Sequence, residues 1–280
     1  MATASRLPRP DAARSRRLAA ERAALARRFA TLVAARPRPP VTLHDETLRA
    51  LVGALDLREQ ETAGHSHRVA LWTLFFAAAC DVDEAELEAI HAGALLHDVG
   101  KIAIPDPILL KEGRLDPREW RVMRTHPSVG RQLLARTQSL RHAAAIPWCH
   151  HERFDGSGYP RRLAGRRIPL GARLFAIIDV YDALRSVRPY KRAYSHARTM
   201  ALLRAEAGRH FDPELLARFV ALPRAALDRL APFARRARPY AELRELVAET
   251  IAWVAARGAE RAIKAVPRTA RSRRPRRHGG

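Results

Sequence analysis

Residues 96–102 read Leu-His-Asp-Val-Gly-Lys-Ile, and this stretch ends an apolar helical run over residues 90–95. The glycine is a natural helix stop. The end of the helix therefore presents an imidazole and a carboxylate together, from His97 and Asp98, with a lysine four residues after the histidine. This combination suits a metal-ligand pair with a cation in reach. On these residues alone, a capped helix with a solvated aspartate and lysine explains the pattern equally well.

The composition indicates a globular protein with one large domain or two small ones, because the chain has 280 residues of which 47% are hydrophobic. The two cysteines, Cys80 and Cys149, are far apart and form no CxxC pattern. They favour a reducing compartment over a disulfide framework. Neither a signal core nor an apolar run of bilayer length is found in the sequence. We therefore expect a cytoplasmic protein.

The net charge of +22 is concentrated at the two ends of the chain. Residues 1–40 carry +8 and residues 257–280 carry another +8, which leaves +6 for the middle. Blocks of like charge are usually solvated tails. Contact with nucleic acid or an anionic membrane is the alternative, and the lack of aromatic residues among the terminal arginines argues against it. A moderately positive middle suits an anionic substrate.

Helical periodicity dominates the middle of the chain, and strand-like alternation is nearly absent. This predicts an all-α fold, a helical bundle with a metal site between helices and basic tails on either side. Residues 152–170 are rich in Gly and Pro and predict a loop. The predicted helices are 43–56, 61–80, 84–98, 116–124, 127–136, 140–151, 171–187, 196–208 and 212–221.

Composition also suggests the domain organisation. Residues 1–40 are expected to form a basic leader rich in Ala and Arg. Its residues 13–35 have a helical pattern, and an unstructured leader is an equally good interpretation. The main folded domain is expected over residues 41–222, followed by a helical extension over 223–256. Residues 257–280 are expected to form a disordered basic tail.

Residues of the metal-ligand type gather at five places along the middle of the chain. A lone histidine in a helix is more often a packed or surface residue than a ligand, so each place alone has an ordinary explanation. Imidazoles combined with carboxylates suit iron or manganese. Two such metals about 3.5–4 Å apart are used to hydrolyse phosphate esters. The places are Glu61 with His65, His97 with Asp98, His126, His150 with His151, and Asp179.

Taken together, these places resemble the HD-GYP family of cyclic di-GMP phosphodiesterases over about residues 45–220. The resemblance implies an HD-type helical bundle and makes residues 41–222 an HD-GYP phosphodiesterase domain. The strongest stretch is residues 150–160, which read His-His-Glu-Arg-Phe-Asp-Gly-Ser-Gly-Tyr-Pro. Supporting motifs are residues 61–65, 96–102, 108–115, 126–130, 168–170, 179–184 and 188–190.

The resemblance implies a role for each matching position. Asp98 would be the carboxylate that bridges two metals, and Lys101 would assist catalysis and bind the substrate phosphate. Glu61 matches a glutamate that recruits a third metal in some members. Arg188 and Lys191 match positions that bind substrate phosphates. The metal ligands would be Glu61, His65, His97, Asp98, His126, His150, His151 and Asp179, and the signature loop would be Gly158, Tyr159 and Pro160.

The implied activity is hydrolysis of cyclic di-GMP to the linear dinucleotide and then to GMP. The implied cofactor is two or three divalent metal ions, with iron expected and manganese as the substitute. The same chemistry on cyclic GMP-AMP is the nearest alternative. A weakly active module that binds partners such as diguanylate cyclases through the signature loop is a third reading. Other partner hypotheses are a second copy of the chain and, through the tails, nucleic acid or an anionic membrane.

Overall fold

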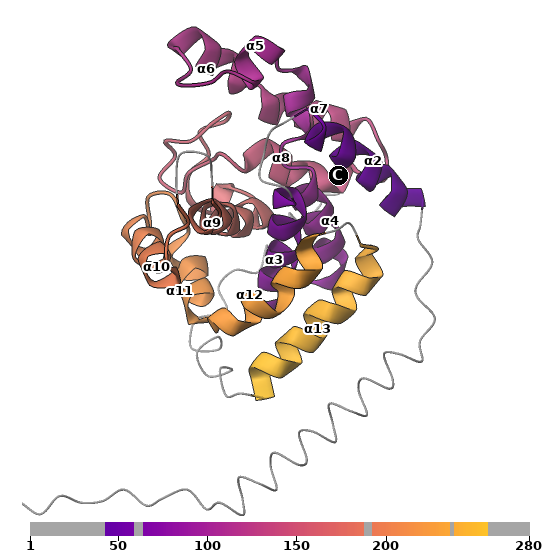
Figure 1. Ribbon diagram of the computed structural model, residues 1–280, viewed down its shortest axis with the longest axis vertical. Helices are drawn as coiled ribbons and strands as arrows, with labels where there is room; N and C mark the ends of the chain where they lie inside the picture. Colours follow the sequence, from indigo (N-terminus) through magenta and orange to yellow (C-terminus); the bar gives the residue numbers. More distant parts are fainter. Residues whose placement is uncertain (1–42, 59–63, 188–191, 236–237, 257–280) are drawn as a thin grey trace, which may run out of the picture. The chain divides into compact units, whose positions relative to one another are not determined.

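The computed structural model describes residues 43–58, 64–187, 192–235 and 238–256, all within the unit Val41–Gly280 (Figure 1). Over these residues the secondary structure is helical, with one isolated bridge between Ala207 and Phe211 and no strand. The prediction of an all-α fold is confirmed. Among the described helices, none is both long enough and apolar enough to cross a bilayer.

The helices follow one another with short connections. Their bounds are α2 Leu43–Asp56, α3 His65–Ala79, α4 Glu84–Leu95, α5 Asp106–Leu109, α6 Pro117–Met123, α7 His126–Ala135, α8 Ala145–Cys149, α9 Leu170–Arg185, α10 His196–Ala205, α11 Pro213–Ala221, α12 Arg224–Leu230 and α13 Tyr240–Ala256. The 3₁₀ turns are η1 Val99–Ala103, η2 Arg141–Ala144, η3 Gly165–Arg167 and η4 Ala231–Arg235.

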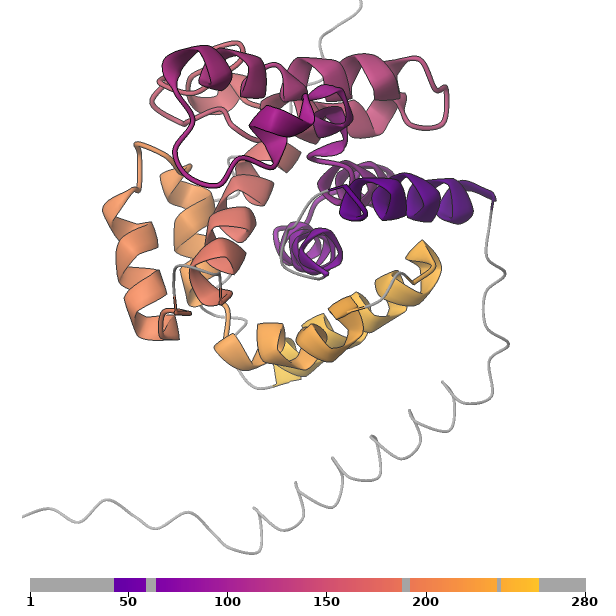
Figure 2. The same cartoon turned by 45° about the horizontal axis from the view of Figure 1, so that its top comes forward.

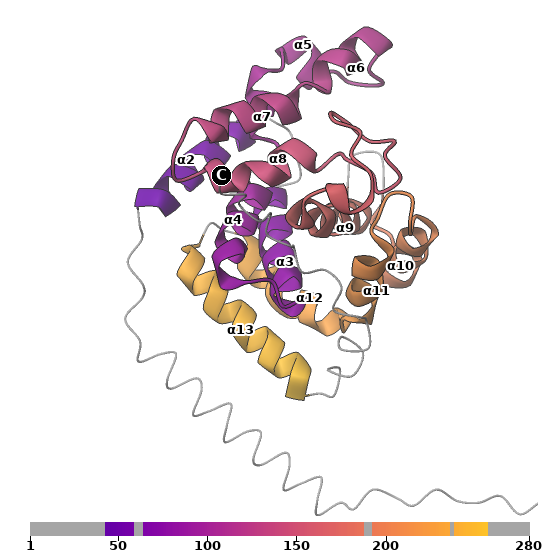
Figure 3. The same ribbon diagram turned by 180° about the vertical axis from the view of Figure 1, so that it is seen from behind.

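Helix α3 is the central element of the fold, and α4, α9 and α13 pack against it (Figures 1 and 3). Nine consecutive residues of α3, from Val69 to Ala77, are buried. A helix that is apolar on all sides has to be surrounded by other elements. Its two adjacent aromatic residues, Phe75 and Phe76, are fully buried. Packing around α3 therefore fixes the position of His65 at its first turn.

The last two helices belong to the same hydrophobic core as α3. Leu227 of α12 and Val247 and Val254 of α13 are buried in the cluster that contains Phe75 and Phe76. In Figure 2 these orange and yellow helices lie on the side opposite the magenta helices α5–α7. Residues 223–256 thus close the bundle on the side away from α5–α7.

Several predicted helices are shorter than expected, and two of these differences concern candidate metal ligands. The predicted helix 140–151 is divided into η2 and α8, because Pro147 has no N–H to donate to the carbonyl of Ala143. The predicted helix 84–98 ends at Leu95, and the chain continues into η1. Helix α5, which begins after Pro105, was not predicted. Both early ends place histidines at helix termini rather than inside helices.

Helices α5 and α6 form an arm, residues 105–124, at one end of the bundle (Figure 1). Neither helix has a buried residue. Polar contacts hold the arm: Arg58 pairs with Asp106 at 2.7 Å and Lys111 with Glu119 at 2.6 Å. Asp116 and Glu119 form a capping box at the start of α6.

Candidate metal centre

The carboxylate of Asp98 lies at the middle of a buried group of histidines. Its Oδ1 is 3.2 Å from Nε2 of His126 and 3.4 Å from Nε2 of His150. Its Oδ2 is 3.1 Å from Nε2 of His97 and 2.7 Å from Nζ of Lys101. The two oxygens therefore face different histidines, which is the arrangement that a bridging carboxylate requires.

Gly100 brings the turn after Asp98 against the start of α7. A Cβ atom at this position would lie 1.9 Å from the carbonyl oxygen of His126 and 2.6 Å from the amide nitrogen of Gly130. Such distances exclude any side chain. The glycine of the opening motif thus permits the close approach that places His126 next to Asp98. It does not end the preceding helix as predicted, because α4 already ends at Leu95 and Gly100 lies within η1.

Backbone carbonyl groups orient three of the histidines. In His97, His126 and His150, Nδ1 hydrogen-bonds to the carbonyl three residues earlier, at 2.9, 2.8 and 3.0 Å. A donor at Nδ1 leaves Nε2 as the lone-pair nitrogen. The three Nε2 atoms all point toward Asp98. Partners of this kind fix the ring orientation of metal-binding histidines in proteins.

A carboxylate orients the fourth buried histidine, His65. Its Nδ1 is 2.8 Å from Oδ2 of Asp182, and Arg68 binds the same carboxylate at 2.8 and 3.0 Å. Its Nε2 faces Oδ1 of Asp179 at 3.4 Å. Burial opposes ionisation of Asp182, but the hydrogen bonds from His65 and Arg68 lower its pKa to about 2. The carboxylate is therefore charged and holds the ring in place.

The potential ligand atoms form two adjacent groups, within each of which they lie no more than 4.8 Å apart. Oδ1 of Asp98 is buried and makes no hydrogen bond of normal geometry with the described residues. A buried carboxylate oxygen without such a bond is costly unless a cation completes it. The donor set therefore fits metal ions. The groups are Asp98, His126, His150 and His151, and His65, His97 and Asp179.

The protonation states suit metal binding. Burial raises the pKa of Asp98, but the neighbouring Lys101 ammonium group and the close imidazoles of His97, His126 and His150 outweigh it and hold that pKa well below its usual range. Burial lowers the pKa of His150 and lowers that of His151 further, with the neighbouring His150 adding to the effect. The carboxylate is thus charged and these imidazoles are neutral, which are the forms that bind metals.

The signature loop folds back onto His151. A Cβ atom at Gly158 would lie 2.5 Å from the carbonyl oxygen of His151, so only glycine fits there. The next residue, Tyr159, donates its N–H to that carbonyl at 3.2 Å and stacks its ring on the imidazole, with centroids 4.7 Å apart. The carboxylate of Glu152 accepts hydrogen bonds from the backbone N–H groups of Arg161 and Leu163, which closes the loop.

Seven of the eight predicted metal ligands are described, and the fold brings all seven together. Lys101 lies beside Asp98 as expected. Glu61, Arg188 and Lys191 lie outside the described residues. Our sequence analysis did not assign Asp182 to the site, although it belongs to the same motif as Asp179. The signal was a second carboxylate three residues later in an apolar helix.

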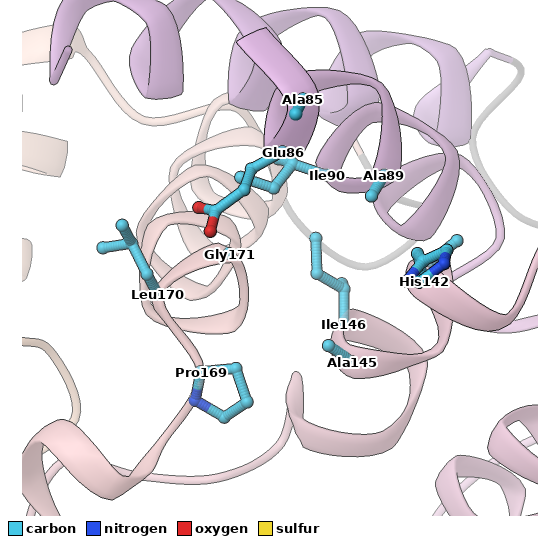
Figure 4. Close-up of a pocket in the computed structure, with 11 residues that line it drawn as sticks. Ala85, Glu86, Ala89, Ile90, His142, Ala145, Ile146, Pro169, Leu170 and Gly171 are labelled. Atoms are coloured by element: carbon cyan, nitrogen blue, oxygen red, sulfur yellow. The ribbon is translucent and has the colours of Figure 1, made fainter. Parts of the chain in front are cut away.

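A separate cavity of about 430 Å³ lies between the starts of α4 and α9 and the segment η2–α8 (Figure 4). Its lining is mostly apolar, with Ile90, Ile146 and Leu170, and its polar side chains are Glu86 and His142. None of the predicted site residues lines it. The metal centre is thus distinct from this cavity.

Residues 49–215 match the HD domain family, so the chain belongs to that family. This confirms the resemblance drawn from the motifs, since similar curated proteins include cyclic di-GMP phosphodiesterases.

Two curated relatives are informative. The chain is 45% identical over 170 residues to the cyclic di-GMP phosphodiesterase response regulator RpfG of Xanthomonas campestris pv. campestris, covering 60% of this chain and 45% of the relative. It is 42% identical over 173 residues to the 3′3′-cGAMP-specific phosphodiesterase 2 of Vibrio cholerae, covering 61% of this chain and 33% of the relative. The matched region thus spans less than half of each relative.

The fold is also similar to that of a solved structure, a cyclic GMP-AMP-specific phosphodiesterase of Vibrio cholerae named V-cGAP3. The TM-score is 0.51 at 19% identity, over 77% of this chain and 60% of the other. At this level of identity the likeness concerns the fold alone.

Proposed function

We propose that the chain is a metal-dependent phosphodiesterase that hydrolyses cyclic di-GMP to the linear dinucleotide and then to GMP. The observation that carries this proposal is the position of Asp98, whose two oxygens face two adjacent groups of ligand atoms. The relative RpfG, named as a cyclic di-GMP phosphodiesterase, supports the choice of substrate.

The ligand set proposed for the metals is Glu61, His65, His97, Asp98, His126, His150, His151 and Asp179. When bound, two or three iron or manganese ions would supply a water acidic enough to attack phosphorus at neutral pH. The protein holds the ligands ready, because the imidazoles are oriented by backbone carbonyls and by Asp182. The site therefore needs little rearrangement when it loads.

Lys101 is the proposed catalytic cation. Its Nζ is 2.7 Å from Oδ2 of Asp98, so a phosphate bound at the centre would lie within reach of the ammonium group. A fixed positive charge there stabilises the charge that develops on the phosphoryl oxygens. Arg188 and Lys191 are proposed to bind the substrate phosphates, as the resemblance implies.

The proposal is tested with anaerobically purified full-length chain, by measuring turnover of cyclic di-GMP and metal content in the same sample. We expect hydrolysis with two to three equivalents of iron or manganese. Asp98→Ala should abolish hydrolysis and deplete the metal while the helical circular dichroism persists. Asp228→Asn, an exposed carboxylate on α12, is the matched control. Full activity in Asp98→Ala would refute the site.

Cyclic GMP-AMP is the second candidate substrate, because the chain is similar to the cGAMP-specific enzyme of Vibrio cholerae at 42% identity. Both cyclic dinucleotides present the same phosphodiester to the metal centre. The ratio of kcat/KM for the two substrates, measured on one preparation, decides between them. If the ratio favours cyclic GMP-AMP, that dinucleotide becomes the proposed substrate in place of cyclic di-GMP.

We also propose that residues 41–222 are the catalytic domain and that 1–40 and 257–280 are accessory tails. Packing of 223–256 into the core of α3 supports keeping that extension in any shortened chain. Removal of residues 1–40 should leave kcat/KM unchanged within about twofold. A folded but inactive truncated protein would assign the leader to the enzyme.

A further inference from the structure

A stack of side chains leads from the metal centre to the arm. The ring of Tyr159 lies on the imidazole of His151, with centroids 4.7 Å apart and planes inclined by 24°. On Tyr159 lies the guanidinium group of Arg124, at 5.2 Å from the ring centroid. The same guanidinium is 5.6 Å from the ring of Trp120, which is 43% exposed. An arginine on α6 is thereby held close to the metal centre.

The charge of Arg124 is not neutralised by any acidic side chain among the described residues. Other cations around the centre have such partners: Lys101 pairs with Asp98, Arg68 with Asp182, and Arg153 with Glu206. Arg124 is exposed, and its guanidinium group contacts two aromatic rings. A guanidinium that stacks on rings keeps the N–H donors along its edge available for an oxyanion.

The proposed substrate has a use for such a group, because a cyclic dinucleotide carries two phosphodiesters. Only one of them can lie at Asp98 and Lys101 during a single turnover. The second remains charged a short distance away within the same ring. A rigidly stacked arginine suits that phosphate, since its planar fork donates two parallel hydrogen bonds.

We propose that Arg124 binds the second, uncleaved phosphate of the cyclic dinucleotide, and that Trp120 and Tyr159 position its guanidinium. This inference rests on the proposed function. It adds a substrate-binding residue to those that the family resemblance implies, which are Lys101, Arg188 and Lys191. It also gives the arm a role, since Trp120 and Arg124 both lie on the α6 side of it.

The test compares two substrates on the metal-loaded full chain: cyclic di-GMP, and bis(p-nitrophenyl) phosphate, which has one phosphodiester and no second phosphate. The variants are Arg124→Ala, Arg124→Lys and the control Arg121→Ala, which removes another exposed arginine from the same helix. All three are checked for metal content.

For Arg124→Ala we expect KM for cyclic di-GMP to rise about tenfold, because a charge-assisted pair of hydrogen bonds is lost, with kcat within about twofold. Kinetics with bis(p-nitrophenyl) phosphate should be unchanged. Arg124→Lys should give an intermediate KM, since the charge remains and the fork is lost. Arg121→Ala should behave as the unmodified chain.

Two results would overturn the inference. One is a KM for cyclic di-GMP in Arg124→Ala within twofold of that in Arg121→Ala. The other is an equal loss with both substrates, which would assign Arg124 to support of the metal centre. If Arg124 had a structural role alone, Arg124→Ala would impair hydrolysis of both substrates to the same extent.

A binding measurement separates this inference from the proposed function. The probe is a bis-phosphorothioate analogue of cyclic di-GMP, titrated calorimetrically into the metal-loaded chain. A dissociation constant about tenfold weaker in Arg124→Ala than in Arg121→Ala supports the inference, even in a protein that shows no turnover. Equal dissociation constants refute it. Absence of both binding and turnover in the unmodified chain refutes the function and the inference together.

Discussion

The metal centre and the arm lie close together, but different forces hold them. His97, His126 and His150 are buried, and each is tied to its own backbone. The helices of the arm contain no buried residue and rely on ion pairs and a capping box. Buried packing leaves little freedom, whereas exposed ion pairs contribute at most about 1 kcal/mol each and are screened by salt. Substitutions that change side-chain volume should therefore affect the metal centre most, and substitutions that remove a charge or a helix cap should affect the arm most.

The largest effect is expected from Gly100→Ala, which would force α7 away from Asp98. The new methyl group would overlap the carbonyl oxygen of His126, so we expect a loss of about 3 kcal/mol or more in the free energy of unfolding. Metal content should fall with it. Urea unfolding and elemental analysis measure both quantities.

Gly53→Ala is the matched control for this variant. Gly53 lies inside α2, and nothing lies within 4 Å of a Cβ built there. The same substitution should stabilise the protein by about 0.5–1 kcal/mol through helix propensity. Equal effects of the two variants would contradict the assignment of Gly100 to a close contact.

Asp182→Asn should have the next largest effect, because it removes the charge that orients His65 and pairs with Arg68. Affinity for metal should fall 10- to 100-fold, as for other partners of metal-binding histidines. Dialysis against a competing chelator, followed by metal analysis, measures this. Retained metal affinity would show that α3 alone fixes the ring of His65.

Asp116→Ala tests the arm through its helix cap. Asp116 accepts hydrogen bonds from the backbone N–H groups of Arg118 and Glu119 at 2.6 and 2.9 Å. Loss of this cap should destabilise α6 by about 1 kcal/mol. Because the arm is not part of the core, we expect faster amide exchange over residues 117–123 with metal content unchanged. Loss of metal in this variant would mean that the arm and the centre fold as one unit.

The smallest effect is expected from Lys111→Ala. Its ion pair with Glu119 lies at the surface, so the free energy of unfolding should change by about 0.5 kcal/mol or less. The difference should disappear at about 1 M salt, where charges are screened within about 3 Å. Unfolding curves at low and high salt check this, and an effect that persists in salt would indicate packing by the lysine stem.

The sequence predicted most helices, because apolar periodicity is a local signal. The resemblance to the HD-GYP family predicted the set of metal ligands, and the seven of them that the structure describes lie together. The division of the predicted helix 140–151 was missed, although Pro147 offered the signal. Glu61, Arg188 and Lys191 lie outside the described residues, and the metal-binding role of the other predicted ligands stays a prediction.

What the sequence could not supply are contacts between distant segments. Asp182 is 117 positions from His65, and Arg124 is 35 positions from Tyr159, so no periodicity connects either pair. Gly100 was predicted as a helix stop, but α4 ends five residues before it and Gly100 lies within η1. Its closeness to His126 depends on how η1 and α7 pack, which only the assembled fold defines.

The histidine anchors have an evolutionary consequence. Three of the four anchored imidazoles are oriented by main-chain oxygens, which every amino acid carries, so substitutions at Ala94, Met123 or Pro147 leave the acceptors in place. His65 differs, because its anchor is a side chain that a single base change can remove. Homologous chains should therefore tolerate substitutions at the three positions that contribute only a backbone carbonyl. They should rarely vary at Asp182, because a substitution there can remove the acceptor that orients His65.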